Sequence, residues 1–543
     1  MRKPKQEAWM IFLGIALFFT AFLVAPLALL LLHSFQTGQG IGLANYISVI
    51  RDPGIAGAIR NSIQVSGLAA AITTVIAFML AYAVNCTKIS HRLKTIIKIG
   101  ISIPMLLPTI TYGFAIIYSF GKQGLLTKLF GGELFQIYGF NGLLIGYVIY
   151  TLPSAFLLIN NSFSYIDKKF IIVSTLLGDG CLRSFANTIL RPMIGTIGGA
   201  FVLSFILSFT DFGIPASIGG TYQVIATQLY QVMLGSIPNF EQGAVIAVLM
   251  LLPALVGVVF LTYIEKFNFH YDAFTVIDLP QNKLRDLAFA LFGIAVVTGI
   301  VAVFLVMFIA PLVKNYPYDM SFTTLFFQKA LFSHSLLEVY RNSIAVAVVS
   351  AVLGTLISYS AAIVNVRTAL RQQAKISLDL FAMITNSVPG MVLGLAYLLL
   401  FNQSDVKGTF SIIILCNIVH FFTAPYLMAK NSLSKLNPAW ETTGELMGDS
   451  WFATMIRVIV PNSMATIVEM FGYYFINTMV TISAVIFLVT ARTAVVTSKI
   501  KELQHFANFN EIFVLSMLIF VTNISVKICC DLVNKKLASE SYG

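Results

Sequence analysis

The residues of this chain that could do chemistry are isolated polar side chains at the ends of long apolar runs. The clearest is Asp211, which closes one such run and is followed by Phe212. A carboxylate near membrane depth is costly, and such residues often line a transport pathway. The alternative is that Asp211 caps the next helix at a wet interface. Its polar companions could line the same cavity or only hydrogen-bond between helices: Thr210, Asn477, Thr478, Thr481 and Ser483.

No pattern in the sequence indicates catalysis. There is no Gly-x-x-x-x-Gly-Lys-Ser/Thr phosphate loop, no nucleophile triad and no cluster of metal ligands. The five cysteines are scattered, and no pair has zinc-ligand spacing. We therefore expect a chain that is not an enzyme and that holds no metal or cofactor of its own.

Two short amphipathic segments stand at matching places between apolar runs. Each combines a helix-forming stretch, a Gly that accepts positive φ and a Pro suited to a first helical turn. This pattern predicts an elbow of two short helices leading into the next span. One copy alone would usually be an ordinary loop, but two matching copies indicate a docking surface. The elbow residues are Ser174, Gly178, Asp179 and Pro192 in the first half, and Glu441, Thr443, Gly444, Gly448, Asp449 and Pro461 in the second.

A proline followed five residues later by a glycine occurs in the third apolar run of each half. Pro108 precedes Gly113, and Pro389 precedes Gly394. Proline removes a backbone hydrogen bond and bends a helix, whereas glycine permits close packing. Paired kinks at a gate would explain the pattern, and so would packing kinks that have no gating role.

The composition places these residues in a membrane protein. The chain has 543 residues, of which 58% are hydrophobic and 10% charged, with a mean hydropathy of +0.86. Apolar runs of about 20 residues predict spanning helices rather than barrel strands. The net charge of +11 comes from basic residues that flank the runs. Anionic lipid headgroups explain it better than nucleic acid does, so no nucleic-acid partner is expected.

The apolar runs predict an all-α polytopic protein of about twelve transmembrane helices. The first six cover residues 9–32, 62–86, 95–120, 140–160, 193–213 and 241–264, and the second six cover 287–313, 343–366, 377–402, 410–430, 462–490 and 511–533. Lys and Arg lie about two to one on the side that holds both termini. We therefore expect a multi-pass protein of the cell membrane with both termini cytoplasmic.

The two halves are repeats of each other. Arg60-Asn-Ser-Ile63 recurs as Arg341-Asn-Ser-Ile344, and Pro108 and Pro389 share the same offset. Each half has six spans and the same orientation, which predicts parallel repeats about an axis along the membrane normal. The predicted parts are a first half (1–266), a cytoplasmic linker (267–286) and a second half (287–543).

The elbows resemble the signature of the permeases of binding-protein-dependent ABC importers, which is Glu-Ala-Ala, three residues, Gly, nine residues and Ile-x-Leu-Pro. Gly448 and Pro461 are 13 apart, as the pattern requires, while Glu441 lies one place before the usual acid. In the first half Ile172, Val173 and Ser174 occupy the Glu-Ala-Ala places, and Gly178 and Pro192 are 14 apart. The first elbow is therefore expected to dock less tightly.

The resemblance implies a permease fold of the type I ABC importers, with two helical elbows that couple to partner subunits. It implies two copies of an ATPase subunit, which would bind ATP and Mg, and an extracytoplasmic solute-binding protein. Membrane lipid would surround the helices.

Two stretches narrow the resemblance to fused permeases of the ferric-iron and 2-aminoethylphosphonate importers. Asp211-Phe-Gly-Ile-Pro215 with Gly219-Gly-Thr-Tyr222 is typical of the group, and Thr481–Leu488 leans toward the aminoethylphosphonate members. The expected cargo is thus 2-aminoethylphosphonate or a related phosphonate, with ferric iron as the alternative. An ion-coupled secondary transporter would need more carboxylates in its core, and an intramembrane enzyme would need a clustered catalytic set.

Overall fold

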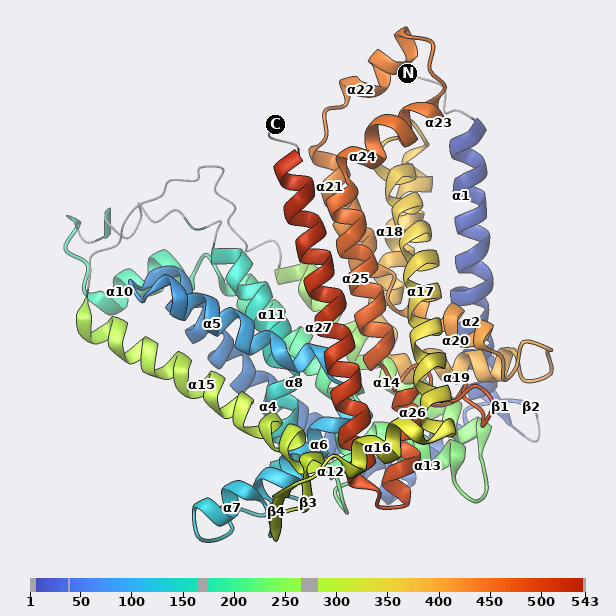
Figure 1. Cartoon of the computed structure of the whole chain (residues 1–543). Helices are drawn as coiled ribbons and strands as arrows, with labels where there is room; N and C mark the ends of the chain where they lie inside the picture. The colour runs from blue at the N-terminus through green and yellow to red at the C-terminus, as the bar shows by residue number, and fades with distance from the viewer. Residues whose placement is uncertain are drawn as a thin grey trace. The chain divides into compact units, whose positions relative to one another are not determined.

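The computed structural model describes residues 6–37, 40–163, 166, 173–174, 176–264 and 282–540. The predicted linker 267–286 lies outside the described residues as far as residue 281, and Lys283 already begins helix α15 (Lys283–Ile309). Within the described part the chain is almost entirely helical, as predicted (Figure 1). The strands there form two short antiparallel hairpins, β1 (Gln36–Thr37) with β2 (Gly40–Ile41) and β3 (Val313–Asn315) with β4 (Asp319–Phe322).

The helices of the described residues account for the twelve predicted spans. Seven are long and apolar enough to cross a membrane alone, and five further bent pairs pass the same test together. The seven are α1–α2 (Gln6–Phe35), α4 (Pro53–Cys86), α8 (Phe140–Ser162), Phe240–Gly257 of α14 (Phe240–Ile264), α15 with its 3₁₀ extension (Lys283–Leu312), α17 (His334–Val366) and Phe509–Ser539 of α27 (Phe509–Glu540).

The chain packs as two compact units. One consists of residues 48–238 and 252–326, and the other of residues 1–47, 239–251 and 327–543. We call them the N-unit and the C-unit. Each therefore contains the first span of the opposite half of the sequence, because α1 and α2 (Ala25–Phe35) belong to the C-unit and α15 belongs to the N-unit.

Packing in the C-unit explains why α1 and α2 belong there. Phe19 is fully buried, stacks on Phe381 at 5.2 Å between ring centroids and meets Phe422 at 4.4 Å. The Tyr397 hydroxyl donates to the carbonyl of Phe22 at 2.6 Å. Aromatic burial of this kind contributes more than its area alone.

The same kind of packing ties α15 to the N-unit. Ser119 donates to the carbonyl of Val303 at 3.2 Å, and Tyr112 and Phe304 meet edge to face at 5.1 Å. Gly100 and Gly293 leave room for a close approach of α15 and α5 (His91–Ser102), since a Cβ on Gly100 would lie 2.5 Å from the side chain of Val297. Small residues at such contacts let membrane helices approach closely.

The third span of each half is broken rather than kinked. In the N-unit α5 and a 3₁₀ turn (Ile103–Leu106) end before Pro108, and α6 (Thr109–Phe120) leaves at 110°. In the C-unit α18 (Gln372–Ser387) and α19 (Gly390–Leu400) meet at 105° around Pro389. Each proline is extended and directly precedes the new helix. A proline also pushes the residue before it out of helical geometry, so the helix ends instead of bending.

The fifth span of each half begins after a second sharp bend. The angle is 70° before α11 (Ile194–Thr210) and 76° before α25 (Met464–Val480). The predicted starts of these spans, 193 and 462, lie within two residues of the observed ones, Ile194 and Met464, and both prolines lie before the bend. The predicted end of the second of these spans, at 490, is wrong. Helix α25 ends at Val480, and the buried stretch 481–488 forms local turns.

The remaining elements are short connectors and further spans. In the N-unit they are α7 (Leu125–Leu129), α10 (Cys181–Phe185), η4 (Ala186–Leu190), α12 (Gly213–Ile218), α13 (Ile225–Leu234) and η6 (Ala310–Leu312). In the C-unit they are η1 (Thr20–Val24), α20 (Phe410–His420), α21 (Thr423–Lys435), α22 (Ala439–Leu446), α23 (Trp451–Thr454), η7 (Met455–Ile459), α24 (Val460–Asn462) and α26 (Val496–His505). Helices α3 (Ala44–Arg51), α14 and α16 (Leu325–Phe332) each have residues assigned to both units.

Candidate functional site

The second elbow is a helix, a glycine turn and a second short helix. Helix α22 ends at Leu446, and Gly448 follows with φ +83°. The amide of Asp449 donates to the carbonyl of Gly444 at 2.9 Å, and that of Gly448 donates to Glu445 at 3.1 Å. This pair of bonds is the Schellman arrangement, which needs a residue with positive φ at the position of Gly448. Ser450 then caps α23 by accepting from the amide of Ala453.

The first elbow has the same turn. Gly178 has φ +76°, and the amide of Asp179 donates to the carbonyl of Ser174 at 3.1 Å. The Ser174 hydroxyl also donates to the Asp179 carboxylate at 2.7 Å, which closes the loop a second time. A shallow open pocket borders this turn and is lined in part by Ser174, Asp179 and Pro192. The sharp glycine turn predicted for each elbow is thus present in both.

Each elbow exposes apolar side chains directly before its glycine. Leu176 and Leu177 are 82% and 77% exposed in the first, and Leu446 and Met447 are 84% and 79% exposed in the second. The two pairs occupy equivalent positions of the repeat. Paired exposed apolar residues on a polar segment are typical of a surface that binds another protein.

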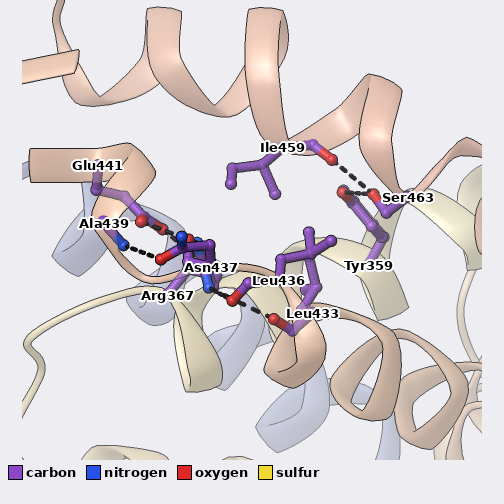
Figure 2. Close-up of polar contacts among 9 residues, drawn as sticks. All are labelled: Tyr359, Arg367, Leu433, Leu436, Asn437, Ala439, Glu441, Ile459 and Ser463. Atoms are coloured by element: carbon purple, nitrogen blue, oxygen red, sulfur yellow. Dashed lines mark hydrogen bonds and ion pairs between the residues drawn. The ribbon is translucent and has the colours of Figure 1, made fainter. Parts of the chain in front are cut away.

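Gly444 and the acid of the second elbow face inward, whereas Thr443 is exposed. A Cβ on Gly444 would lie 2.5 Å from Thr454 Oγ1, so the glycine lets α22 and α23 cross closely. The Thr443 hydroxyl donates within its own helix to Ala439. The Glu441 side chain is only 13% exposed and pairs with Arg367, whose side chain is 4% exposed (Figure 2).

In the N-unit, Asp211 acts as a helix cap and also joins the Pro108 break. Its carboxylate accepts from the amide of Ile214 at 2.8 Å, at the start of α12, and from the hydroxyl of Thr109. Asp211 is 7% exposed, and Phe212 beside it is fully buried. The capping part of the alternative therefore describes the local role of Asp211, although the residue is buried rather than at a wet surface. The structure also brings together two features that the sequence analysis treated separately, the pathway carboxylate and the proline break.

The other pathway candidates make local bonds in their own units. Thr210 donates to the carbonyl of Ile206, and Asn477 donates to that of Tyr473. The carbonyl of Thr481 accepts from the hydroxyl of Thr497 at 2.8 Å. Thr478 is buried within α25. These residues belong to the C-unit except for Thr210, which adjoins Asp211 in the N-unit.

Close backbone packing at the proline breaks follows the repeat. A Cβ on Gly213 would lie 2.1 Å from Thr109 Oγ1, whereas in the C-unit a Cβ on Gly390 would lie 2.7 Å from Ser483 Oγ. The hydroxyl and the glycine have thus exchanged sides between equivalent positions. The paired glycines predicted as gate kinks pack against the same segments. A Cβ would lie 2.0 Å from Ser217 Oγ at Gly113 and 2.5 Å from the carbonyl oxygen of Ala484 at Gly394.

Sequence reasoning missed two contacts. The hydroxyl of Ser62 accepts from the amide of Ile225 at 2.8 Å, and that of Ser343 accepts from Val496 at 2.7 Å. Ser62 thereby caps the start of α13, and Ser343 caps the start of α26. The repeated Arg-Asn-Ser-Ile sequence contained the signal, because it places both serines at equivalent positions. Sequence reasoning also missed Arg367, which nothing in the sequence marks as a partner of Glu441.

Comparison with known proteins agrees with this geometry. The binding-protein-dependent transport system inner membrane component family matches twice, over residues 73–269 and 354–539. The chain is 26% identical over 509 residues to the ferric transport system permease protein FbpB of Actinobacillus pleuropneumoniae, covering 90% of this chain and 72% of that protein.

Two further relatives show how far the similarity extends. The putative ferric transport system permease protein FbpB 1 of Haemophilus influenzae is 26% identical over 495 residues, covering 87% of this chain and 77% of that protein. The molybdenum transport system permease protein ModB of Azotobacter vinelandii is 26% identical over 187 residues, which are 32% of this chain and 78% of that protein. The chain belongs to the binding-protein-dependent transport family, as a fused two-domain permease subunit of an ABC importer in the inner membrane, and it is a transporter subunit rather than an enzyme.

Proposed function

We propose that this permease passes ferric iron, delivered by an extracytoplasmic solute-binding protein, across the cell membrane. The observation that supports it most is the similarity to two ferric transport permeases along almost the whole chain, in both halves. The sequence alone leaned toward 2-aminoethylphosphonate, with ferric iron as the alternative. The relatives favour the alternative.

The chemistry of the pathway candidates points the same way. A phosphonate is anionic, and a cavity that held it would need basic groups at membrane depth. The proposed pathway residues include the carboxylate of Asp211 and several hydroxyls and amides, but no Lys or Arg. Oxygen ligands suit a hard cation better than they suit an anion. We take the residues to form a weak polar passage, with most of the affinity residing in the binding protein.

Energy would come from two ATPase subunits that bind ATP and Mg and press on the two elbows. The exposed pairs Leu176–Leu177 and Leu446–Met447 would enter the ATPase surface. The basic residues of the tails and of alternate loops would hold both termini on the cytoplasmic side. The broken third spans at Pro108 and Pro389 would act as the gate, since short helices around a break can tilt without unwinding a whole span.

Cargo is tested by uptake into cells that lack their own iron and phosphonate importers. The cells would produce this permease together with its partner ATPase and binding protein. Radiolabelled ferric iron should accumulate, and excess aminoethylphosphonate should leave the rate unchanged. Accumulation of labelled aminoethylphosphonate, unaffected by ferric iron, would show that the cargo assignment is wrong while leaving the family assignment intact.

A further inference from the structure

Arg367 lies at the end of α17 and bonds three successive parts of the approach to the second elbow. One guanidinium nitrogen donates to the carbonyl of Leu436 at 2.9 Å, and another donates to that of Asn437 at 3.0 Å. The second nitrogen also donates to the Glu441 carboxylate at 2.8 Å, while Nε lies 2.5 Å from the other oxygen of that carboxylate. Figure 2 shows these bonds converging on one side chain. The end of α21, the turn and helix α22 are thereby fixed to α17.

A second bond attaches the same helix to the exit of the elbow. The hydroxyl of Tyr359 pairs with that of Ser463 at 2.5 Å, and Ser463 also donates to the carbonyl of Ile459 (Figure 2). Ser463 is the residue at the 76° bend into α25. Tyr359 lies two helical turns before Arg367, on the same side of α17. Helix α17 therefore holds the elbow on both sides, before and after the exposed turn at Gly448.

The burial of the ion pair makes this attachment stiff. The side chains of Arg367 and Glu441 are 4% and 13% exposed, so neither charge can turn to bulk water if the pair separates. A planar guanidinium that meets both carboxylate oxygens also fixes the angle between the two elements. Breaking such a pair is far more costly than breaking an exposed one, because a buried charge is left without a partner.

The first elbow is attached differently. The positions equivalent to Arg367 and Glu441 are Cys86 and Ile171, so the repeat has no charges to form the pair there. The position equivalent to Tyr359 is Phe78, whose ring meets that of Phe185 in α10 at 6.1 Å. Tyr82 meets the same ring at 6.0 Å. Aromatic contacts are less directional than an ion pair with several hydrogen bonds, so they allow more sliding.

We propose that α17 is the element that carries movement of the second elbow into the helix bundle, and that Arg367, Glu441 and Tyr359 are positioning residues for this transmission. Glu441 acts inward on Arg367 rather than outward on the ATPase. The second elbow is then attached rigidly to the helix bundle, and the first elbow is attached less rigidly. This inference rests on the proposed role of the elbows as the ATPase contacts.

The test uses the whole complex of permease, ATPase and binding protein in proteoliposomes. The variants are Glu441→Gln, Arg367→Glu, Glu441→Arg, the charge exchange Arg367→Glu/Glu441→Arg, and the milder Tyr359→Phe. The matched control is Lys499→Gln, which removes an ion-pair partner on α26, a helix bonded near the other end of α17 through Ser343. The measurements are ATPase copurification, binding-protein-stimulated ATP hydrolysis and cargo transported per ATP.

The Glu441→Gln permease should still copurify with the ATPase, and the complex should still hydrolyse ATP at the wild-type rate. The amount of cargo transported per ATP should fall by about tenfold. The charge exchange should recover part of that ratio relative to either single reversal, and Tyr359→Phe should lower it less. An unchanged ratio in Glu441→Gln would overturn the proposal. Loss of ATPase copurification with an unchanged ratio in the remaining complexes would overturn it too, because Glu441 would then be an outward contact.

Failure of the proposed function would look different. A wild-type complex that hydrolyses ATP in response to its binding protein but moves no ferric iron would contradict the cargo assignment alone. The ratio would then be measured with the cargo that does cross. If the ratio of cargo transported per ATP fell equally in these variants and in Lys499→Gln, the ion pair would have only a general structural role and the proposal would be wrong.

Discussion

Replacing Gly213 with alanine would put a methyl group where the N-unit has no room for one. The new Cβ would lie 2.1 Å from Thr109 Oγ1 and 2.5 Å from the backbone nitrogen of Ile110. The second contact is with backbone, so a change of rotamer cannot relieve it. Helix α12 and the first turn of α6 must separate by about 1 Å to restore ordinary contact in a close-packed interior.

The loss of stability expected for Gly213→Ala has two contributions. Overpacking of this kind costs about 1–3 kcal/mol. The separation also stretches the hydrogen bond from Thr109 to Asp211, whose loss adds about 1 kcal/mol. Gly213→Ala should therefore destabilise the protein by about 2–4 kcal/mol. Thr109→Ala in the same chain should give little relief, because the contact with Ile110 remains.

The C-unit offers the matched comparison. A Cβ on Gly390 would meet Ser483 Oγ at 2.7 Å, and its next contacts, the amide of Ala484 and Nε2 of His420, are at 3.1 and 3.2 Å. Gly390→Ala should thus be relieved largely by Ser483→Ala. The control is Gly67→Ala in α4, where no atom lies within 4 Å and the expected effect is neutral or slightly stabilising.

The assay is thermal unfolding of the purified variants in detergent, followed by fluorescence-detected gel filtration. The expected order of stability places Gly67→Ala with the wild type, then Gly390→Ala/Ser483→Ala, then Gly390→Ala, and Gly213→Ala last. If Gly213→Ala were as stable as Gly67→Ala, the close approach of α12 to α6 would be wrong. Rescue of Gly213→Ala by Thr109→Ala would show that the side chain, and not the backbone, limits the space.

Three further predictions concern the caps, the turn and the pathway. Ser62→Ala and Ser343→Ala should each destabilise the protein by about 1–3 kcal/mol in the same unfolding assay, since each leaves a buried amide unpaired; no change for either would refute the capping role. Gly448→Arg should abolish uptake, whereas Gly448→Asn, which tolerates positive φ, should keep most of it, and Gly178→Arg should be milder; equal loss in the Asn and Arg variants would indicate strain rather than a blocked ATPase surface. Asp211→Asn should lower the maximal uptake rate with little change in the half-saturating ligand concentration, and a large shift of that concentration alone would mean that the permease itself binds cargo there.

The number of spans and the glycine turns could be predicted because they depend on local sequence. Twelve apolar runs of spanning length match seven long helices and five bent pairs among the described residues. Gly178 and Gly448 adopt positive φ, as a turn between short helices requires. The tandem repeat could also be recognised in the sequence, and it extends to details such as the two serine caps.

The course of the broken spans could not be predicted from hydropathy. Buried turns at 481–488 are as apolar as a helix, so hydropathy alone extends the predicted span past Val480. A proline in an apolar run is compatible with either a kinked helix or a broken one. Only the packing around Pro108 and Pro389 determines that the helices end there. The inclusion of α1 in the C-unit and α15 in the N-unit depends on long-range packing, which periodicity does not encode.

The inward direction of Glu441 also lay beyond sequence reasoning. Its spacing resembles a position that could face the ATPase, and its partner Arg367 lies 74 residues earlier in the chain. An ion pair between such distant residues leaves no local pattern. The weaker docking of the first elbow, expected from its missing acid, stays a prediction. The structure shows a different asymmetry, because the buried Arg367–Glu441 pair of the second elbow has no charged counterpart in the first half.

The most direct test of the account is ATP-driven uptake by the complete complex in proteoliposomes. With ATP and Mg on the elbow side and the loaded binding protein on the other, radiolabelled ferric iron should enter at a rate that follows ATP hydrolysis. Uptake should stop without ATP and should persist when proton and sodium gradients are abolished. Uptake that needs an ion gradient and ignores ATP would contradict the account.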